Sequence, residues 1–182
     1  MSRERLVRLL RERSLRTGDF VLSSGARSTY YIDARRTTMS GQGLRLIGRL
    51  GHQAIRDAGW APRAVGGLTL GADPVSYAIA HAATLEGATL DAFTVRKEPK
   101  DHGTGRRIEG AFEPGDTVVV VEDVVTSGDS ALNAAAAVRD AGATVAGVFC
   151  VVDRQEGGRE RLREAGLEVV ALVSRTELLE RD

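Results

Sequence analysis

Residues 118–130 read VVVVEDVVTSGDS and combine an apolar run, two adjacent acids and a loop of small or hydroxylated residues. Four consecutive valines are typical of a parallel strand that is covered on both faces. Ligands of open α/β sheets bind beyond the carboxyl ends of the strands, which is where we expect Glu122 and Asp123 to lie. The stretch therefore predicts both an α/β fold and the position of its functional site.

The loop after the two acids has the composition of a phosphate-binding segment. Small residues around Gly128, followed by an alanine-rich helix, can present several backbone N–H groups to an anion at a helix N-terminus. Carboxylates can accept hydrogen bonds from sugar hydroxyls, so the acids and the loop together predict a site for a ribose 5-phosphate. The alternative is an ordinary strand-to-helix turn in which Thr126 or Ser127 caps the helix and the acids are solvated.

Strands alternate with helices along most of the chain. The patterns predict strands at 20–22, 30–32, 64–68, 90–95, 117–121, 145–152 and 167–173. Helices are expected from Leu6 to a stop at Gly18, from Ser40 to Gly59, and over 72–86, 130–141 and 158–165, with a last short helix opened by a capping box at Ser174. This order predicts one α/β domain around a mainly parallel sheet, preceded by a hairpin-like hood.

Composition and charge exclude several classes of protein. The 182 residues include 25 Lys plus Arg and 25 Asp plus Glu, and this zero net charge argues against a broad nucleic-acid surface. The single cysteine, Cys150, is expected in the core, and His52 and His81 are given no role. No apolar run resembles a signal peptide or reaches the roughly 20 residues of a membrane span. We expect a soluble cytoplasmic protein without nucleic-acid or membrane partners.

A second signal lies at residues 96–107, RKEPKDHGTGRR. Five cations against two anions give this segment a charge of +3 in a chain whose net charge is zero. Its proline and glycines oppose regular structure, and a long irregular segment in a compact domain is usually functional. We predict a mobile cationic loop over 96–112, with a solvated surface loop as the alternative.

These segments resemble known proteins. The stretch 118–130 is similar to the phosphoribosyl-pyrophosphate motif of type I phosphoribosyltransferases, and Arg-Lys-Glu-x-Lys-x-His-Gly at 96–103 resembles the catalytic loop of the orotate phosphoribosyltransferases. Residues 20–33, 66–74 and 153–158 resemble the base-covering, pyrophosphate-side and orotate-carboxylate segments of that group. The resemblance implies a type I phosphoribosyltransferase fold in a single domain, 1–182, with a helix and hood at 1–38 and a core at 60–175.

The activity implied by the resemblance is that of an orotate phosphoribosyltransferase in de novo pyrimidine (UMP) biosynthesis. Such an enzyme transfers ribose 5-phosphate from 5-phosphoribosyl 1-diphosphate to orotate, with Mg2+ bound mainly through the diphosphate. The resemblance also implies a homodimer, in which Arg96, Lys100 and His102 act in the neighbouring subunit's site and Lys97 acts in its own.

The resemblance assigns roles to individual residues. Lys100, Lys97 and Asp123 are the implied catalytic residues, and no residue is a metal ligand. Orotate is expected to contact Thr126 and Arg154, because a guanidinium group can bind a carboxylate through two parallel hydrogen bonds. The implied donor-binding residues are Arg96, Lys97, Lys100, His102, Glu122, Asp123, Val124, Val125, Thr126, Ser127, Gly128, Asp129 and Ser130.

The sequence departs from the best-known pattern at two places. Many members of the group have Lys where this chain has Ser23, and an aromatic-Lys pair where it has Leu70-Gly71. Tyr30 and Tyr31 are candidates for covering the base, with core packing as the alternative. Two other functions remain open, a phosphoribosyltransferase for another base such as a purine and a regulator that senses phosphoribosyl pyrophosphate.

Overall fold

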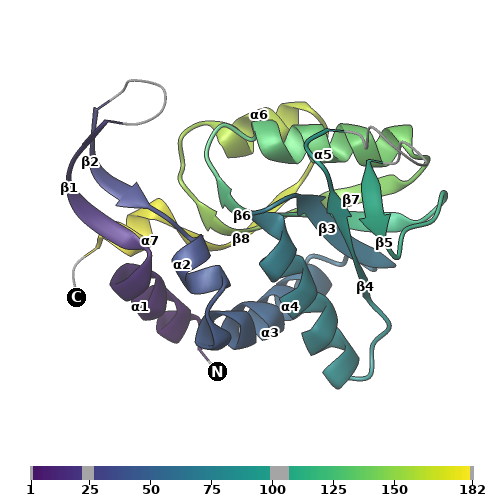
Figure 1. Cartoon of the computed structure of the whole chain (residues 1–182), viewed down its shortest axis with the longest axis horizontal. Helices are drawn as coiled ribbons and strands as arrows, with labels where there is room; N and C mark the ends of the chain where they lie inside the picture. Colours follow the sequence, from purple (N-terminus) through teal and green to yellow (C-terminus); the bar gives the residue numbers. More distant parts are fainter. Residues whose placement is uncertain (1, 22–26, 99–106, 181–182) are drawn as a thin grey trace.

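The central feature is a six-stranded sheet, seen in a computed structural model that describes residues 2–21, 27–98 and 107–180 (Figure 1). Every neighbouring pair of strands is parallel except the antiparallel edge pair β5 and β4. The mainly parallel α/β architecture is therefore confirmed. In spatial order the strands are β5 (Ile108–Gly110), β4 (Asp91–Val95), β3 (Ala64–Leu68), β6 (Thr117–Val125), β7 (Thr144–Asp153) and β8 (Val169–Ser174).

The valine run occupies the centre of this sheet, in β6. Its four side chains are fully buried and alternate between two apolar clusters, with Val119 and Val121 in one and Val118 and Val120 in the other. Helices α3 (Gly41–Asp57) and α4 (Ala72–Leu85) contribute to the first cluster, and α5 (Asp129–Asp140) and α6 (Gly158–Glu164) to the second. The sheet is covered on both faces, as a continuous apolar strand requires.

The N-terminal segment forms a separate two-stranded antiparallel sheet beside the core (Figure 1). It consists of β1 (Leu15–Val21) and β2 (Arg27–Ile32), which follow α1 (Arg3–Arg13) and precede α2 (Arg35–Thr38). The predicted hairpin-like hood is thus confirmed in its described part. Helix α1 packs on α3 and on α7 (Arg175–Leu179), and α7 begins with the predicted capping box of Ser174 and Glu177.

Three expectations about element boundaries were wrong. The first helix does not run to Gly18 but ends at Arg13, because the chain from Leu15 pairs with β2. Strand β6 does not end at Val121: it continues through both acids to Val125 by pairing with β7. The range 96–112 is not a loop throughout, since Ile108–Gly110 forms β5 along the edge of β4.

The structure also bears on the predictions for the single cysteine and for membrane-spanning helices. Cys150 is fully buried in β7, and burial raises the pKa of its thiol, which confirms its assignment to the core. Among the helices of the described ranges, none is long and apolar enough to cross a membrane.

Replacement of Phe149 by alanine tests the packing of the sheet against α3. The ring is fully buried in β7 and lies close to Gly51 of α3, so its removal leaves a cavity. We expect Phe149→Ala to lower the free energy of unfolding by about 3–5 kcal/mol in urea titrations. Leu85→Ala, at a side chain that is 75% exposed, is the control and should change it by less than about 0.5 kcal/mol. Equal losses in the two variants would contradict this account of the core.

Candidate active site

A pocket of about 330 Å³ opens beyond the carboxyl ends of β3 and β6. Its walls come from residues 31–35 after the hood, residues 68–71 after β3, and residues 122–124 of β6. Lys97, Thr126, Ser130 and Arg154 complete the lining. A larger hollow of about 480 Å³ lies at β5 and the end of α5, but it is lined by none of the predicted site residues.

The two acids of β6 differ in environment from ordinary surface carboxylates. Glu122 is only 5% exposed, and its buried Oε1 atom has no hydrogen-bond partner within the described parts of the chain. Burial, together with the charge of Asp123, raises the pKa of Glu122 to about 8. Burial also raises the pKa of Asp123, whose Oδ1 accepts the N–H of Val124 at 2.9 Å. An unpartnered buried oxygen in a pocket indicates a place for a ligand's hydrogen-bond donor.

The loop between β6 and α5 surrounds a second, smaller hollow. This space of about 100 Å³ is lined by Glu122 and residues 124–131, and it lies at the N-terminus of the 12-residue α5. Gly128 is the N-cap, with a φ of +81° that glycine adopts without strain. The Ser127 hydroxyl donates to Asp129 Oδ2 at 2.7 Å, and no side chain caps the helix. The alternative of a simple capping turn therefore does not describe this loop.

A close backbone approach brings the end of β3 to the acids. A Cβ atom on Gly71 would lie 2.6 Å from Oδ1 of Asp123, and one on Gly67 would lie 2.0 Å from the carbonyl oxygen of Val121. Both positions therefore require glycine if β3 and β6 are to keep this spacing. The departure at Leu70-Gly71 lets Asp123 pack directly against the backbone that follows β3.

Two neighbouring cations of the predicted loop, Arg96 and Lys97, point in different directions. Lys97 is exposed and lines the pocket. Arg96 instead lies 3.4 Å from Glu109 of β5 and takes no part in the lining. Lys100 and His102, like Ser23, lie outside the residues that the structure describes.

A charged pair that the sequence does not mark as functional, Asp33 and Arg35, lies at the pocket wall. Arg35 donates from Nε to Asp33 Oδ1 at 2.9 Å, and this bond raises the pKa of the guanidinium. Both residues line the pocket. Asp33 is the last residue of the segment 20–33 that resembles the base-covering segment, whereas for Arg35 the only signal in the sequence was its position shortly after the second hood strand.

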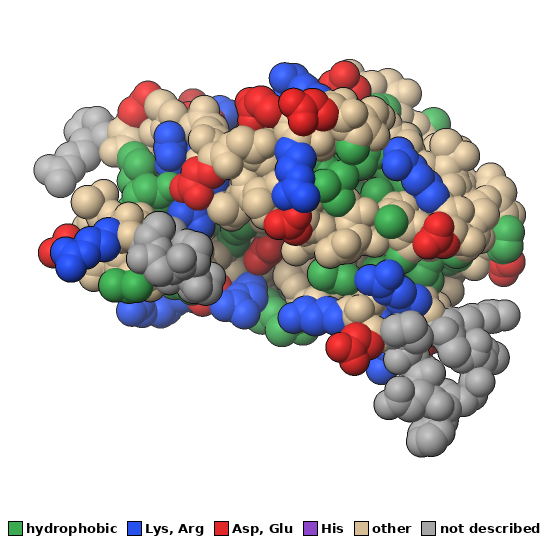
Figure 2. Space-filling model, turned by 90° about the horizontal axis from the view of Figure 1, so that it is seen from above, with side chains coloured by type: hydrophobic (Ala, Val, Ile, Leu, Met, Phe, Trp, Pro, Cys, Tyr) green, Lys and Arg blue, Asp and Glu red, His purple; other side chains and the backbone are tan. Residues whose placement is uncertain are grey.

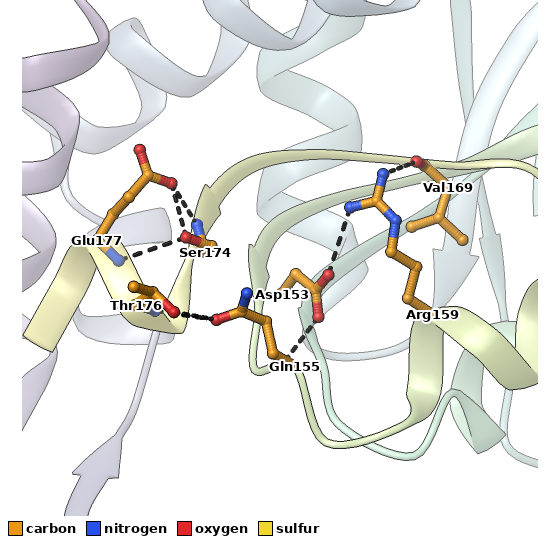
Figure 3. Close-up of polar contacts among 7 residues, drawn as sticks. All are labelled: Asp153, Gln155, Arg159, Val169, Ser174, Thr176 and Glu177. Carbon is orange, nitrogen blue, oxygen red and sulfur yellow. Dashed lines mark hydrogen bonds and ion pairs between the residues drawn. The ribbon is translucent and has the colours of Figure 1, made fainter.

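Arg154 lies in the turn after β7, and its backbone N–H donates to the carbonyl oxygen of Val125 at 3.0 Å. The next residue, Gln155, has a φ of +54°, and its N–H donates to Asp153 Oδ1 at 2.8 Å. Figure 3 shows how Gln155 Oε1 also meets Thr176, whose hydroxyl donates at 2.7 Å. Asp153 is buried and lies 3.4 Å from Arg159. These contacts fix the backbone that carries Arg154.

The structure thus brings most of the predicted site residues together. The pocket is lined by Lys97, Glu122, Asp123, Val124, Thr126, Ser130 and Arg154, and the adjoining hollow by Val125, Ser127, Gly128 and Asp129 as well. Tyr31 lines the pocket, whereas Tyr30 lies against Arg154.

Comparison with known proteins agrees with this geometry. The family described as phosphoribosyl transferase domain matches residues 38–168. Orotate phosphoribosyltransferase of Aquifex aeolicus is 47% identical over 98% of each chain, and that of Corynebacterium glutamicum is 48% identical over 97% of this chain and 94% of the relative. The chain belongs to the orotate phosphoribosyltransferase family. The type I phosphoribosyltransferase fold is confirmed by the same comparisons.

Solved structures of orotate phosphoribosyltransferases superpose closely on the chain. The enzyme of Mycobacterium tuberculosis H37Rv in complex with Fe(III) dicitrate gives a TM-score of 0.88 at 45% identity, covering 98% of this chain and 99% of the other. The same protein in complex with 5-phospho-alpha-D-ribosyl 1-diphosphate gives a TM-score of 0.79 at 40% identity, covering 97% and 90%.

The raised pKa of Glu122 predicts a pH dependence of stability. Its pKa rises from 4.5 to about 8 on folding, so between these values the unfolded chain is ionised while the folded chain keeps the proton. The free energy of unfolding should therefore fall as pH rises from about 4.5 to about 8, by on the order of a few kcal/mol from this group. Glu122→Gln should flatten this fall in urea titrations at pH 5 and pH 8.

Glu164→Gln is the matched control, because Glu164 is exposed on α6. It should keep the pH dependence of the wild type. Parallel curves for Glu122→Gln and the wild type would show that Glu122 does not titrate as its burial indicates.

Proposed function

We propose that this protein transfers ribose 5-phosphate from 5-phosphoribosyl 1-diphosphate to orotate, giving orotidine 5′-monophosphate and diphosphate in de novo pyrimidine biosynthesis. The observation that carries the proposal is the pocket in which two buried acids, a loop at a helix N-terminus and Arg154 lie together. The full-length similarity to orotate phosphoribosyltransferases supports it.

The donor would lie across the end of β6. Glu122 and Asp123 accept hydrogen bonds from the ribose hydroxyls, which supply the donor that Glu122 Oε1 lacks among the described residues. Residues 126–130 hold the 5-phosphate with backbone N–H groups at the start of α5. Displacement at an anomeric carbon develops positive charge on the sugar, which the carboxylate of Asp123 would stabilise.

The acceptor base would lie in the same pocket, beside Arg154, Thr126 and Tyr31. Arg154 binds the orotate carboxylate, Thr126 contacts the base, and Tyr31 covers it from the hood. A guanidinium suits this role because its planar fork matches a carboxylate.

The departing diphosphate requires cations. Lys97 lines the pocket and would stabilise the leaving group together with Lys100, His102 and Arg96 of the cationic segment. Mg2+ would be held mainly by diphosphate oxygens and water, which are the ligands it prefers. When bound, it would neutralise charge that develops on the leaving group.

We propose a homodimer in which the cationic segment serves two sites. Lys97 acts in the site of its own chain, whereas Arg96, Lys100 and His102 act in that of the partner. The opposite directions of the first two side chains support this assignment, since Lys97 lines the pocket and Arg96 turns toward Glu109. We further propose that residues 1–182 act as one domain in the cytoplasm, with a helix and hood segment at 1–38, the core at 60–175 and the catalytic segment within 96–112.

The two alternative functions, a regulator that contacts nucleic acid and a purine phosphoribosyltransferase, have less support. A regulator that contacts nucleic acid needs a broad basic face. Figure 2 shows acidic and basic side chains interspersed over the face it presents. Transfer to a purine would leave the guanidinium of Arg154 without the carboxylate that suits it.

Turnover of orotate is the direct test. With 5-phosphoribosyl 1-diphosphate and Mg2+, the protein should consume orotate and should not consume adenine. The loss of orotate absorbance measures the reaction. Arg154→Ala should raise KM for orotate by at least about tenfold, because it removes a charge-assisted hydrogen bond. The matched control is Arg163→Ala, at an exposed residue of α6. Turnover of adenine without orotate would overturn the proposal.

The shared sites predict complementation between two defective subunits. Lys100→Ala and Asp123→Asn should each lower kcat by at least about a hundredfold in pure dimers. Random mixing gives hybrid dimers with one intact site, so the mixture should regain about a quarter of the wild-type activity. Differently tagged subunits verify the exchange. No recovery despite verified exchange would show that each site is built from a single chain.

A further inference from the structure

Glu156, which has no role in the site as described so far, is the meeting point of three side chains. Its Oε1 atom accepts a hydrogen bond from the Tyr30 hydroxyl at 2.6 Å and another from Arg154 Nη2 at 2.9 Å. Arg175 Nη1 lies 4.0 Å from the same oxygen. One carboxylate oxygen therefore joins the hood, the turn after β7 and the start of α7.

Arg154 is restrained from two directions by this arrangement. Its guanidinium carbon lies 5.4 Å from the centre of the Tyr30 ring, within the range of a cation–π contact. Its side chain is only 12% exposed, and Nε is buried without a hydrogen-bond partner in the ranges that the structure describes. The contacts to Glu156 and Tyr30 thus occupy one end and one face of the guanidinium and leave its remaining N–H groups for a ligand.

The backbone beneath these side chains is itself fixed. Gln155, between Arg154 and Glu156, is bonded to Asp153 through its N–H and to Thr176 through its side chain (Figure 3). The backbone on either side of Gln155 is therefore held in place, and with it the starting points of the Arg154 and Glu156 side chains. Side chains placed by a rigid support keep a binding group in productive geometry.

We propose that Glu156 and Tyr30 are positioning residues that hold Arg154 for the carboxylate of the acceptor base and so select a carboxylated pyrimidine. The inference rests on the proposed function. The negative charge of Glu156 stabilises the largely buried guanidinium when the pocket is empty, and the Tyr30 ring packs against one face of it. A base without a carboxylate leaves the remaining N–H groups of Arg154 unpaired, which penalises its binding.

The test compares Glu156→Gln, Glu156→Ala and Tyr30→Phe in the full-length protein. KM for orotate should rise by about tenfold in Glu156→Ala and less in Glu156→Gln, which keeps an acceptor oxygen. Tyr30→Phe keeps the ring and should raise KM by a smaller factor. KM for 5-phosphoribosyl 1-diphosphate should stay within about twofold, and the preference for orotate over uracil should fall in step with the rise in KM.

Glu160→Gln, at an exposed residue of α6, is the matched control and should leave both KM values unchanged. Thermal unfolding checks that each variant folds. Equal rises in KM for both substrates would indicate a structural role only and would overturn the inference, as would an unchanged KM for orotate in Glu156→Ala. A wild-type protein that does not consume orotate would instead overturn the proposed function.

Discussion

The burial of a carboxylate at the end of a fully covered strand is the constraint on which the site depends. Strand β6 is apolar over Val118–Val121 because helices cover both faces of the sheet, and this environment extends to Glu122. The acid is therefore poorly solvated, and its pKa rises to about 8. Such a group is costly in the empty protein unless it keeps its proton or acquires partners. A polyhydroxylated ligand would supply those partners, so the poor solvation of Glu122 in the empty pocket favours binding of such a ligand.

The rest of the pocket follows from how closely its backbone segments approach this strand. Glycine at 67 and at 71 allows the end of β3 to lie against Val121 and Asp123. Gly128 turns the chain from β6 into α5, and its positive φ brings the helix N-terminus to the acids. Backbone geometry thus places the acids of β6 beside the N-terminus of α5. The sugar and phosphate sites proposed above need this arrangement.

Sequence predicted the parts of the fold that depend on local pattern. The valine run, the capping box at Ser174 and the loop around Gly128 were all recognisable from spacing and composition. It did not predict β5, because a three-residue strand exists only through pairing with β4. The contact between Glu156 and Tyr30 was equally hidden, since the two residues lie 126 positions apart in the chain. Contacts between distant segments carry no periodic signal.

The distribution of charge explains why some cations of the site are paired with acids and others lie on the separate segment 96–107. The net charge of the chain is zero, yet acids are concentrated at the end of β6 and cations in the segment 96–107. If all the cations lay permanently beside Glu122 and Asp123, they would pair with these acids and compete with the sugar hydroxyls for them. Arg35 and Arg154 avoid this because Asp33 and Glu156 already bind them. In the proposed dimer, Arg96, Lys100 and His102 would reach the diphosphate in the partner's site without first neutralising the acids of their own chain, and only Lys97 would face those acids.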